Sequence, residues 1–116
     1  MCPTTSANKP LEYHFALNER DEIIGICTLK RDALTGFELY LLVVDPHYQR
    51  RGIGQMLVAK CLAIARQEAY PCVNCVVVAN NRAMLRLLRK NDFHPMSASP
   101  PRIAGSPELI HLRCDL

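Results

Sequence analysis

The chain has 116 residues, a length that suits one domain with a modest core. Its 49% hydrophobic and 22% charged residues are ordinary for a globular protein, and a formal net charge of +3 is too small to indicate a nucleic-acid binder. No apolar run reaches the roughly 18 residues of a membrane helix, and residues 1–10 lack the apolar segment of a secretion signal. We therefore expect a cytoplasmic protein without a membrane partner, with a leader at 1–10 and a single domain at 11–116.

The first part of the chain predicts three strands. Residues 11–17 alternate between apolar and polar side chains, as in a half-buried strand. Residues 22–30 form a second predicted strand, and the polar turn at 18–21 joins the two into a hairpin. Residues 37–44 are apolar on both faces, which predicts a central strand of the sheet.

Helices and strands alternate in the next part of the chain. Apolar residues recur at helical spacing through 52–69, and Pro71 blocks continuation of that helix. The β-branched run at 73–79 predicts a buried strand, which the helix connects in parallel to the third strand. Asn80 and Asn81 then cap a second helix.

The remaining predicted elements are a helix at 82–90 and strands at 93–98 and 108–114. The order β-β-β-α-β-α-β-β predicts an α/β fold with a mixed sheet.

The loop between the third strand and the first helix carries the clearest chemical signal. At the start of a helix, backbone N–H groups lack an intrahelical partner, and the helix dipole adds partial positive charge. Such an end is a site for a phosphate or a diphosphate. Gly52 and Gly54 leave room for a phosphate to reach the backbone, and Arg50 and Arg51 add full positive charges.

Residues 49–54, Gln-Arg-Arg-Gly-Ile-Gly, fit the pattern Q/R-x-x-G-x-G/A and follow a Val-x-Pro sequence. This segment resembles the acyl-CoA diphosphate loop of the GNAT acetyltransferase superfamily. It is not the dinucleotide fingerprint G-x-G-x-x-G, because position 57 is leucine, and it is not a P-loop, because no G-K-[ST] follows.

The resemblance covers roughly residues 11–116, which is most of the chain. It implies a mixed, mainly antiparallel sheet whose central parallel pair is splayed around acyl-CoA. The first strand of the family and the two helices after it look absent, which implies a more open acceptor groove and a barer sheet edge. Exposed edges and apolar patches favour association, so we expect a homodimer or a subunit of a complex.

The resemblance also implies which residues hold acetyl-CoA. The carrier arm would hydrogen-bond the backbone of Leu42, Val43 and Val44 near a bulge in the central strand. The other implied cofactor-binding residues are Gln49, Arg50, Arg51, Gly52, Ile53, Gly54, Gln55, Asn80 and Asn81. For Gln49 the alternative is a loop-surface residue, and for Asn81 it is a plain helix cap.

A general base must remove a proton from an ammonium acceptor before the amine can attack a thioester. Glu38 lies where some relatives place a catalytic glutamate, and a carboxylate or a water that it holds can do this; the alternative is an exposed strand residue. Tyr40 and His47 are weaker candidates. His94 and His111 could also act as the base, although a lone strand histidine more often has a packing or surface role.

Backbone N–H near Val44 would stabilise the oxyanion. The position at which the family often has an acidic tyrosine is Leu88, which cannot donate a proton, although a thiolate is a tolerable leaving group near neutral pH. We expect an N-acetyltransferase that moves an acetyl group from acetyl-CoA to a primary amine of a small molecule or peptide. An acetyl-CoA-binding regulatory subunit remains the alternative, and nucleic-acid binding through the arginines is the weakest hypothesis.

Six cysteines are present, and Cys72 and Cys75 form a lone C-x-x-C. A zinc site would need a second pair of ligands at suitable spacing, and none is evident. A redox motif normally opens a helix, whereas this pair enters a strand-like run. We therefore expect no metal site, and Cys27 and Cys61 fit small core residues.

Overall fold

The computed structural model describes residues 11–34, 36–99 and 105–116. Along the chain the elements are β1 (Glu12–Leu17), β2 (Ile23–Asp32), β3 (Gly36–Val44), a 3-10 turn η2 (Pro46–Tyr48), α1 (Ile53–Gln67), β4 (Cys72–Val78), α2 (Arg82–Lys90), β5 (His94–Ser99) and β6 (Leu109–Asp115). All the predicted strands and helices are present. Their bounds shift by a few residues; α1, for example, ends before residue 69 because Ala69 has a φ of 61°.

The strands form one six-stranded sheet in the order β1-β2-β3-β4-β6-β5. β3 and β4 pair in parallel, and α1 is the crossover between them, while the other neighbouring strands pair in antiparallel fashion. The predicted mixed, mainly antiparallel sheet with a central parallel pair is therefore confirmed, and β3 is central as its two apolar faces indicated.

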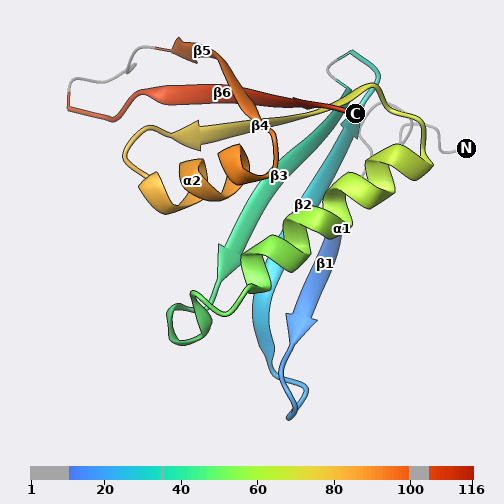
Figure 1. The fold of residues 1–116 in the computed structure, drawn as a ribbon, viewed down its shortest axis with the longest axis vertical. Coiled ribbons are helices and arrows are strands. Elements are labelled where there is room, and N and C mark those ends of the chain that lie inside the picture. Colours follow the sequence, from blue (N-terminus) through green and yellow to red (C-terminus); the bar gives the residue numbers. More distant parts are fainter. Residues whose placement is uncertain (1–10, 35, 100–104) are drawn as a thin grey trace, which may run out of the picture.

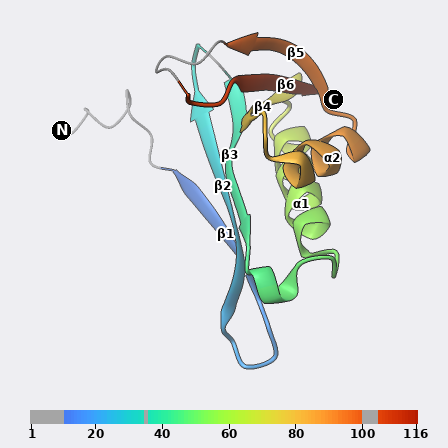
Figure 2. The same ribbon diagram turned by 90° about the vertical axis from the view of Figure 1, so that its left-hand side faces the viewer.

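Both helices pack on the same face of the sheet (Figures 1 and 2). The core lies between them and the strands and includes fully buried Phe37, Leu39 and Leu88. Removing such side chains from water contributes about 1.5–3 kcal/mol each. The buried side of α1 consists of Ile53, Leu57, Val58, Cys61, Leu62 and Ala65. No helix among the described residues is long and apolar enough to cross a membrane.

The thiols of the core are small apolar groups in this structure. Burial raises the pKa of Cys27 to about 11 and that of Cys75 to about 12, so both stay protonated at neutral pH. Cys72 and Cys75 are three residues apart on a strand, so their side chains point to opposite faces of the sheet. Within the described ranges no three potential metal ligands gather.

The opposite face of the sheet, which we call the open face, carries no helix from the part of the chain that the structure describes (Figure 2). Large apolar side chains on β1 and β3 are about half exposed there, with Tyr13 at 53%, Phe15 at 51% and Val43 at 49%. A contiguous exposed apolar surface is typical of an interaction site. The predicted homodimer stays a prediction.

Candidate active site between strands β3 and β4

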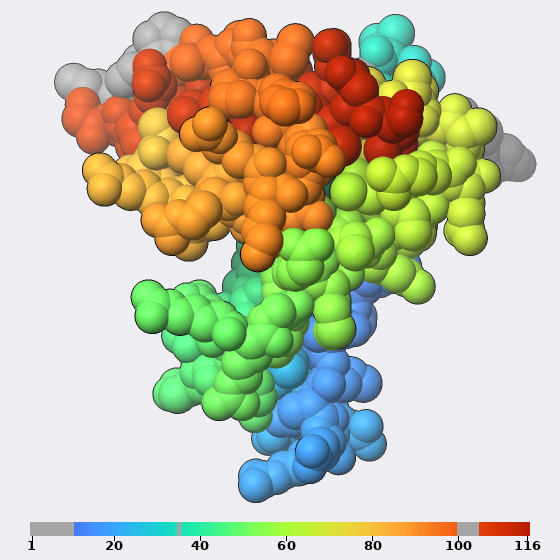
Figure 3. Space-filling model, viewed as in Figure 1, coloured from blue at the N-terminus to red at the C-terminus, as the bar shows by residue number. Residues whose placement is uncertain are grey.

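The central parallel pair separates soon after it begins. β3 and β4 pair only through Phe37 with Val73 and Glu38 with Asn74, and both strands then continue without pairing with each other. Figure 1 shows this V-shaped divergence, and Figure 3 shows a notch between the α2 segment and the loop that precedes α1. A strand edge without a strand partner offers backbone groups to an extended ligand.

A β-bulge lies where the opening begins. Leu29 faces Leu39, but the next pair is Thr28 with Leu41, so Tyr40 is the extra residue of β3. A bulge bends its strand and increases the local twist. The bend therefore helps to carry β3 away from β4, at the place where the family resemblance led us to expect a bulge.

Backbone direction along β3 decides which residues face the opening. The N–H of Asp45 donates to the carbonyl of Ile24 in β2 at 2.8 Å. Because successive residues of a strand point to alternate edges, Val43 is also directed toward β2, whereas Leu42 and Val44 face the opening. Of the three residues predicted to hold the carrier arm, Val43 is thus directed away from the opening by its backbone.

The loop before α1 is ordered by short contacts. The Asp45 carboxylate accepts from the His47 backbone N–H at 2.8 Å, which lowers the pKa of Asp45, and the His47 ring lies 3.1 Å from the same oxygen. Asn18 donates to the Tyr48 hydroxyl at 3.1 Å, which ties the loop to the β1–β2 hairpin. The His47 side chain is 90% exposed and follows the end of β3, away from Glu38.

The N-terminal end of α1 lacks a side-chain cap and has no acidic residue in its first turn. The first helical bond runs from the Met56 N–H to the Gly52 carbonyl at 3.0 Å, so the N–H groups of residues 53–55 precede the helical ladder. Arg50 and Arg51 are exposed, and neither forms an ion pair with another residue in the described ranges. The Arg51 guanidinium lies 5.0 Å from the centre of the Tyr48 ring. These features suit an anion.

The two glycines of the loop occupy different structural environments. Gly52 has a φ of 83°, a conformation that side chains disfavour, and a Cβ there would meet nothing within 4 Å. A Cβ on Gly54 would lie 3.0 Å from the Leu87 side chain, so α1 approaches α2 closely at this glycine. Reciprocal hydrogen bonds of 2.8 and 2.9 Å between Gln55 and Asn91 strengthen the same contact.

Three other predicted positions have defined environments. The Asn81 side chain accepts from the Met84 N–H at 3.2 Å, so it caps α2, and Asn80 is exposed beside it. Gln49 reaches the Val44 carbonyl at 3.4 Å. Leu88 is fully buried in the core, and no proton donor occupies that position.

Glu38 lies on the open face beside Asn74, at the narrow end of the opening. The Asn74 side-chain oxygen lies 3.2 Å from Nε2 of His111 on β6, so His111 and Glu38 flank the same amide. Sequence reasoning missed Asn74, although it is the one polar residue in the Cys-Val-Asn-Cys-Val-Val-Val strand. A polar residue in such a run was the available signal.

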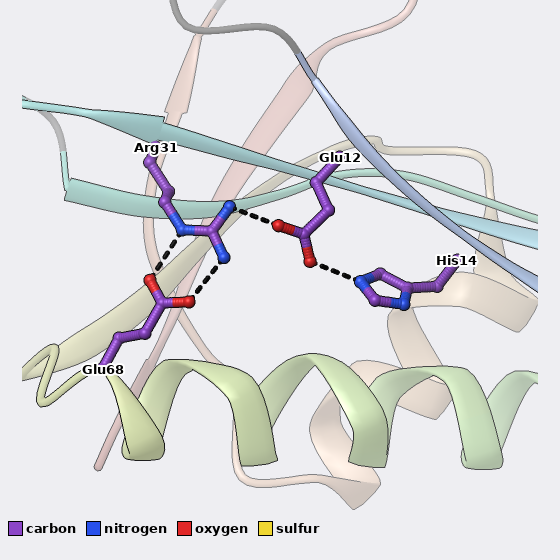
Figure 4. Close-up of polar contacts among 4 residues, drawn as sticks. All are labelled: Glu12, His14, Arg31 and Glu68. Atoms are coloured by element: carbon purple, nitrogen blue, oxygen red, sulfur yellow. Dashed lines mark hydrogen bonds and ion pairs between the residues drawn. The ribbon is translucent and has the colours of Figure 1, made fainter.

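A second polar cluster joins the other end of α1 to the sheet (Figure 4). Arg31 donates two hydrogen bonds to Glu68, of 2.7 and 2.6 Å, and one to Glu12 at 2.7 Å. Glu12 also contacts His14 Nε2 at 2.5 Å, and these two partners hold its pKa below the usual 4.5. These contacts tie α1 to β1 and β2, which indicates a structural role.

Comparison with known proteins agrees with this geometry. The Acetyltransferase (GNAT) family model matches residues 3–93. Mycothiol acetyltransferase of Jonesia denitrificans is 31% identical over 81 residues, which are 69% of this chain; the chain spans only 26% of that relative's length.

Solved structures share the fold. A GNAT family acetyltransferase of Elizabethkingia anophelis with acetyl-CoA bound superposes with a TM-score of 0.80 at 20% identity, over 97% of this chain and 81% of that one. The ribosomal-protein-S18-alanine N-acetyltransferase of Escherichia coli gives a TM-score of 0.79 at 17% identity, over 97% and 73%. This chain belongs to the GNAT acetyltransferase family.

Proposed function

We propose that the chain transfers the acetyl group of acetyl-CoA to a primary amine of a small molecule or a peptide. The diphosphate binds the N–H groups of residues 53–55 at the start of α1, beside Arg50 and Arg51. The carrier arm then follows the unpaired edge of β3 through the backbone of Leu42 and Val44. Gln49 and Asn80 border this path.

One observation carries this proposal. The helix α1 begins without a side-chain cap, β3 continues past its pairing with β4 with an unpaired edge, and Glu38 lies where that pairing ends. A diphosphate, an amide-bearing arm and a reacting thioester require these three features in this order. The acetyl-CoA and CoA complexes among structures of the same fold support the choice of donor.

The acceptor loses a proton before its nitrogen attacks the thioester carbon, and Glu38 takes that proton through water. The electron pair of the carbonyl moves onto its oxygen, where a backbone N–H stabilises the charge. The attached nitrogen gives up its second proton to solvent, and the intermediate collapses with cleavage of the C–S bond, so that coenzyme A leaves as a thiolate. A thiol pKa near about 8.5 allows this departure without an acid, which is compatible with leucine at position 88.

Strand geometry narrows the choice of the residue whose N–H stabilises the oxyanion. Glu38 and Val44 are six residues apart, and such a segment of strand spans roughly 20 Å, too far for both to act on one carbonyl. Leu42 faces the same opening and is nearer to Glu38. We therefore propose the Leu42 N–H as the oxyanion donor and assign Val44 to the carrier arm.

The test is thiol release from acetyl-CoA with a panel of primary amines. Glu38→Gln should lower kcat by about 100-fold or more while leaving the affinity for acetyl-CoA unchanged, because a base acts on the acceptor alone. An unchanged kcat would remove Glu38 from the mechanism. Absence of thiol release with every amine would contradict the transferase itself.

The second candidate is an acetyl-CoA-binding regulatory subunit. The buried Leu88 favours it, since the family's usual proton donor is missing. Tight binding of acetyl-CoA without thiol release would support this alternative over the enzyme.

We also propose that two copies associate through the open face. Burial of half-exposed Phe15 and Val43 would favour such a dimer. Sedimentation of the wild type and of Phe15→Ser tests this: a wild-type dimer that dissociates in the variant is expected, and a wild-type monomer contradicts it.

A further inference from the structure

One row of polar residues crosses the open face at the level of Glu38. Strand register places them side by side, each on a neighbouring strand. In order across the sheet they are Lys30 on β2, Glu38 on β3, Asn74 on β4, Arg113 on β6 and His94 on β5. The residues next to this row point to the helices, because side chains alternate along a strand.

Two cations of the row have unused donors. The Lys30 ammonium lies 5.4 Å from the Tyr40 ring centre and forms no ion pair with a described residue, although Glu38 is directly opposite. Arg113 Nε lies 3.1 Å from the Asp115 carboxylate. The terminal guanidinium nitrogens of Arg113 donate no hydrogen bond to any other residue that the structure describes, and the side chain is 40% exposed. A planar guanidinium with free donors is well suited to a carboxylate.

We propose that the acceptor is a primary amine that carries a carboxylate, with the amine at Glu38 and the carboxylate at Arg113, assisted by Lys30. The inference rests on the proposed transferase function. Neighbouring strands are about 4.8 Å apart, so one or two strands separate Glu38 from the two cations by roughly 5 to 10 Å. Omega-amino acids and peptides with an acidic residue near the N-terminus have this separation.

A substrate with two opposite charges would explain why charged side chains stand in an otherwise apolar surface. The Glu38 carboxylate alone would attract any protonated amine, whereas an amine that carries no carboxylate gains nothing from Arg113. A substrate that pairs with both groups is selected by charge at two points, and an amine without the anion leaves the terminal guanidinium nitrogens of Arg113 without a hydrogen-bond acceptor. Arg113 is therefore a specificity residue that acts on substrate binding.

The experiment compares each amino carboxylate with its uncharged amide. The pairs are 4-aminobutyrate and 4-aminobutyramide, 6-aminohexanoate and its amide, and the dipeptides Ala-Glu and Ala-Gln with amidated C-termini. With the wild type, kcat/KM should be at least about tenfold higher for the carboxylate of each pair, as expected for one charge-assisted hydrogen bond.

Variants locate the effect. In Arg113→Gln the ratio within each pair should fall to near one through a rise in KM, with the KM for acetyl-CoA unchanged, and Arg113→Lys should restore part of it. Lys30→Gln should lower the ratio less. Arg86→Gln removes an exposed arginine of α2 as a matched control and should keep the full ratio.

Equal kcat/KM for carboxylates and amides, or an undiminished ratio in Arg113→Gln, would overturn the inference. If no amine is acetylated, the transferase proposal fails separately, and binding then decides: 4-acetamidobutyrate should perturb the backbone amide resonances of Arg113 and Asn74 more than its amide does. No difference between the two compounds would overturn the inference there as well.

Discussion

The two ends of α1 are built in opposite ways. At the C-terminal end, Glu68 is held by two hydrogen bonds from Arg31, which also binds Glu12 (Figure 4). At the N-terminal end, no side chain caps the helix, and Arg50 and Arg51 have no ion-pair partner in the described ranges. Both ends belong to the same helix, so the difference between them lies in the side chains that surround each end.

The helix dipole favours anions at the N-terminus and cations at the C-terminus, so Glu68 at one end and Arg50 and Arg51 before the other oppose it, whereas Arg66 in the last turn favours it. At the C-terminal end, Arg31 neutralises Glu68, so the protein itself compensates the unfavourable charge. At the other end, Arg50 and Arg51 add to the positive end of the dipole, and nothing in the described chain offsets them. The unfavourable charge at the second end is explained if an anionic ligand binds there.

The largest expected effect comes from breaking the C-terminal end. Arg31→Met keeps the apolar stem but removes the three hydrogen bonds to Glu12 and Glu68 and the positive charge that both carboxylates face. We expect a loss of about 3 kcal/mol in the free energy of unfolding, the lower end for such a deletion because both carboxylates are more than one-third exposed. Denaturant unfolding measures it, with Arg66→Met as control. Affinity for acetyl-CoA in the folded variant should be unchanged, and a large loss of affinity would contradict the division between the two ends.

Breaking the N-terminal end should have the reverse profile. Arg50→Glu reverses a charge on an exposed side chain, so stability should change little. The Kd for acetyl-CoA should rise about 30-fold, and this effect should shrink at high salt. Lys60→Glu makes the same charge change on the exposed side of α1 and serves as control in calorimetry. Equal losses in the two variants would show only a general effect of net charge.

A pair of glycines sharpens the comparison by separating strain from binding. Gly52 and Gly36 have φ values of 83° and 84°, and a Cβ on either meets nothing within 4 Å. Gly52→Ala and Gly36→Ala should each reduce stability by about 1 kcal/mol. Only Gly52→Ala should weaken acetyl-CoA binding, because its methyl group lies beside the proposed diphosphate site. A similar loss of affinity in Gly36→Ala would contradict a local effect.

The smallest effect concerns pH at the C-terminal end. The folded-state pKa of Glu12 lies below 4.5 through its contacts with His14 and Arg31, so the carboxylate adds stability above that pH. This contribution disappears as pH falls through the lowered value. Because the side chain is partly exposed, we expect less than about 1 kcal/mol. Unfolding at pH values from about 6 to 3 should show a shallower decline for Glu12→Gln than for the wild type, and parallel curves would contradict the assignment.

Much of the fold could be predicted from the periodicity of apolar residues and from the residues that end helices and strands. The alternation at 11–17, the β-branched run at 73–79 and the loop at 49–54 each determine a local structure with little help from distant contacts. The predicted and observed bounds differ most where an element ends, as at Ala69, because a positive φ depends on local packing.

The rest depends on register and distant pairing. The extra residue Tyr40 is visible only against its partner strand, and Arg31 meets Glu68 from 37 positions away. The same holds for Gly54, whose packing against Leu87 cannot be read from the loop motif. Glu38 and His111 could be named from the sequence, but their place beside Asn74 on the open face depends on strand register.

Amide resonances under titration with acetyl-CoA test the central claim most directly. We predict that saturating acetyl-CoA shifts the backbone N–H signals of Ile53, Gly54 and Gln55, together with those of Leu42 and Val44, and leaves the signal of Glu68 in place. Saturable binding that leaves the first turn of α1 unchanged would contradict the proposal that these amides hold the diphosphate.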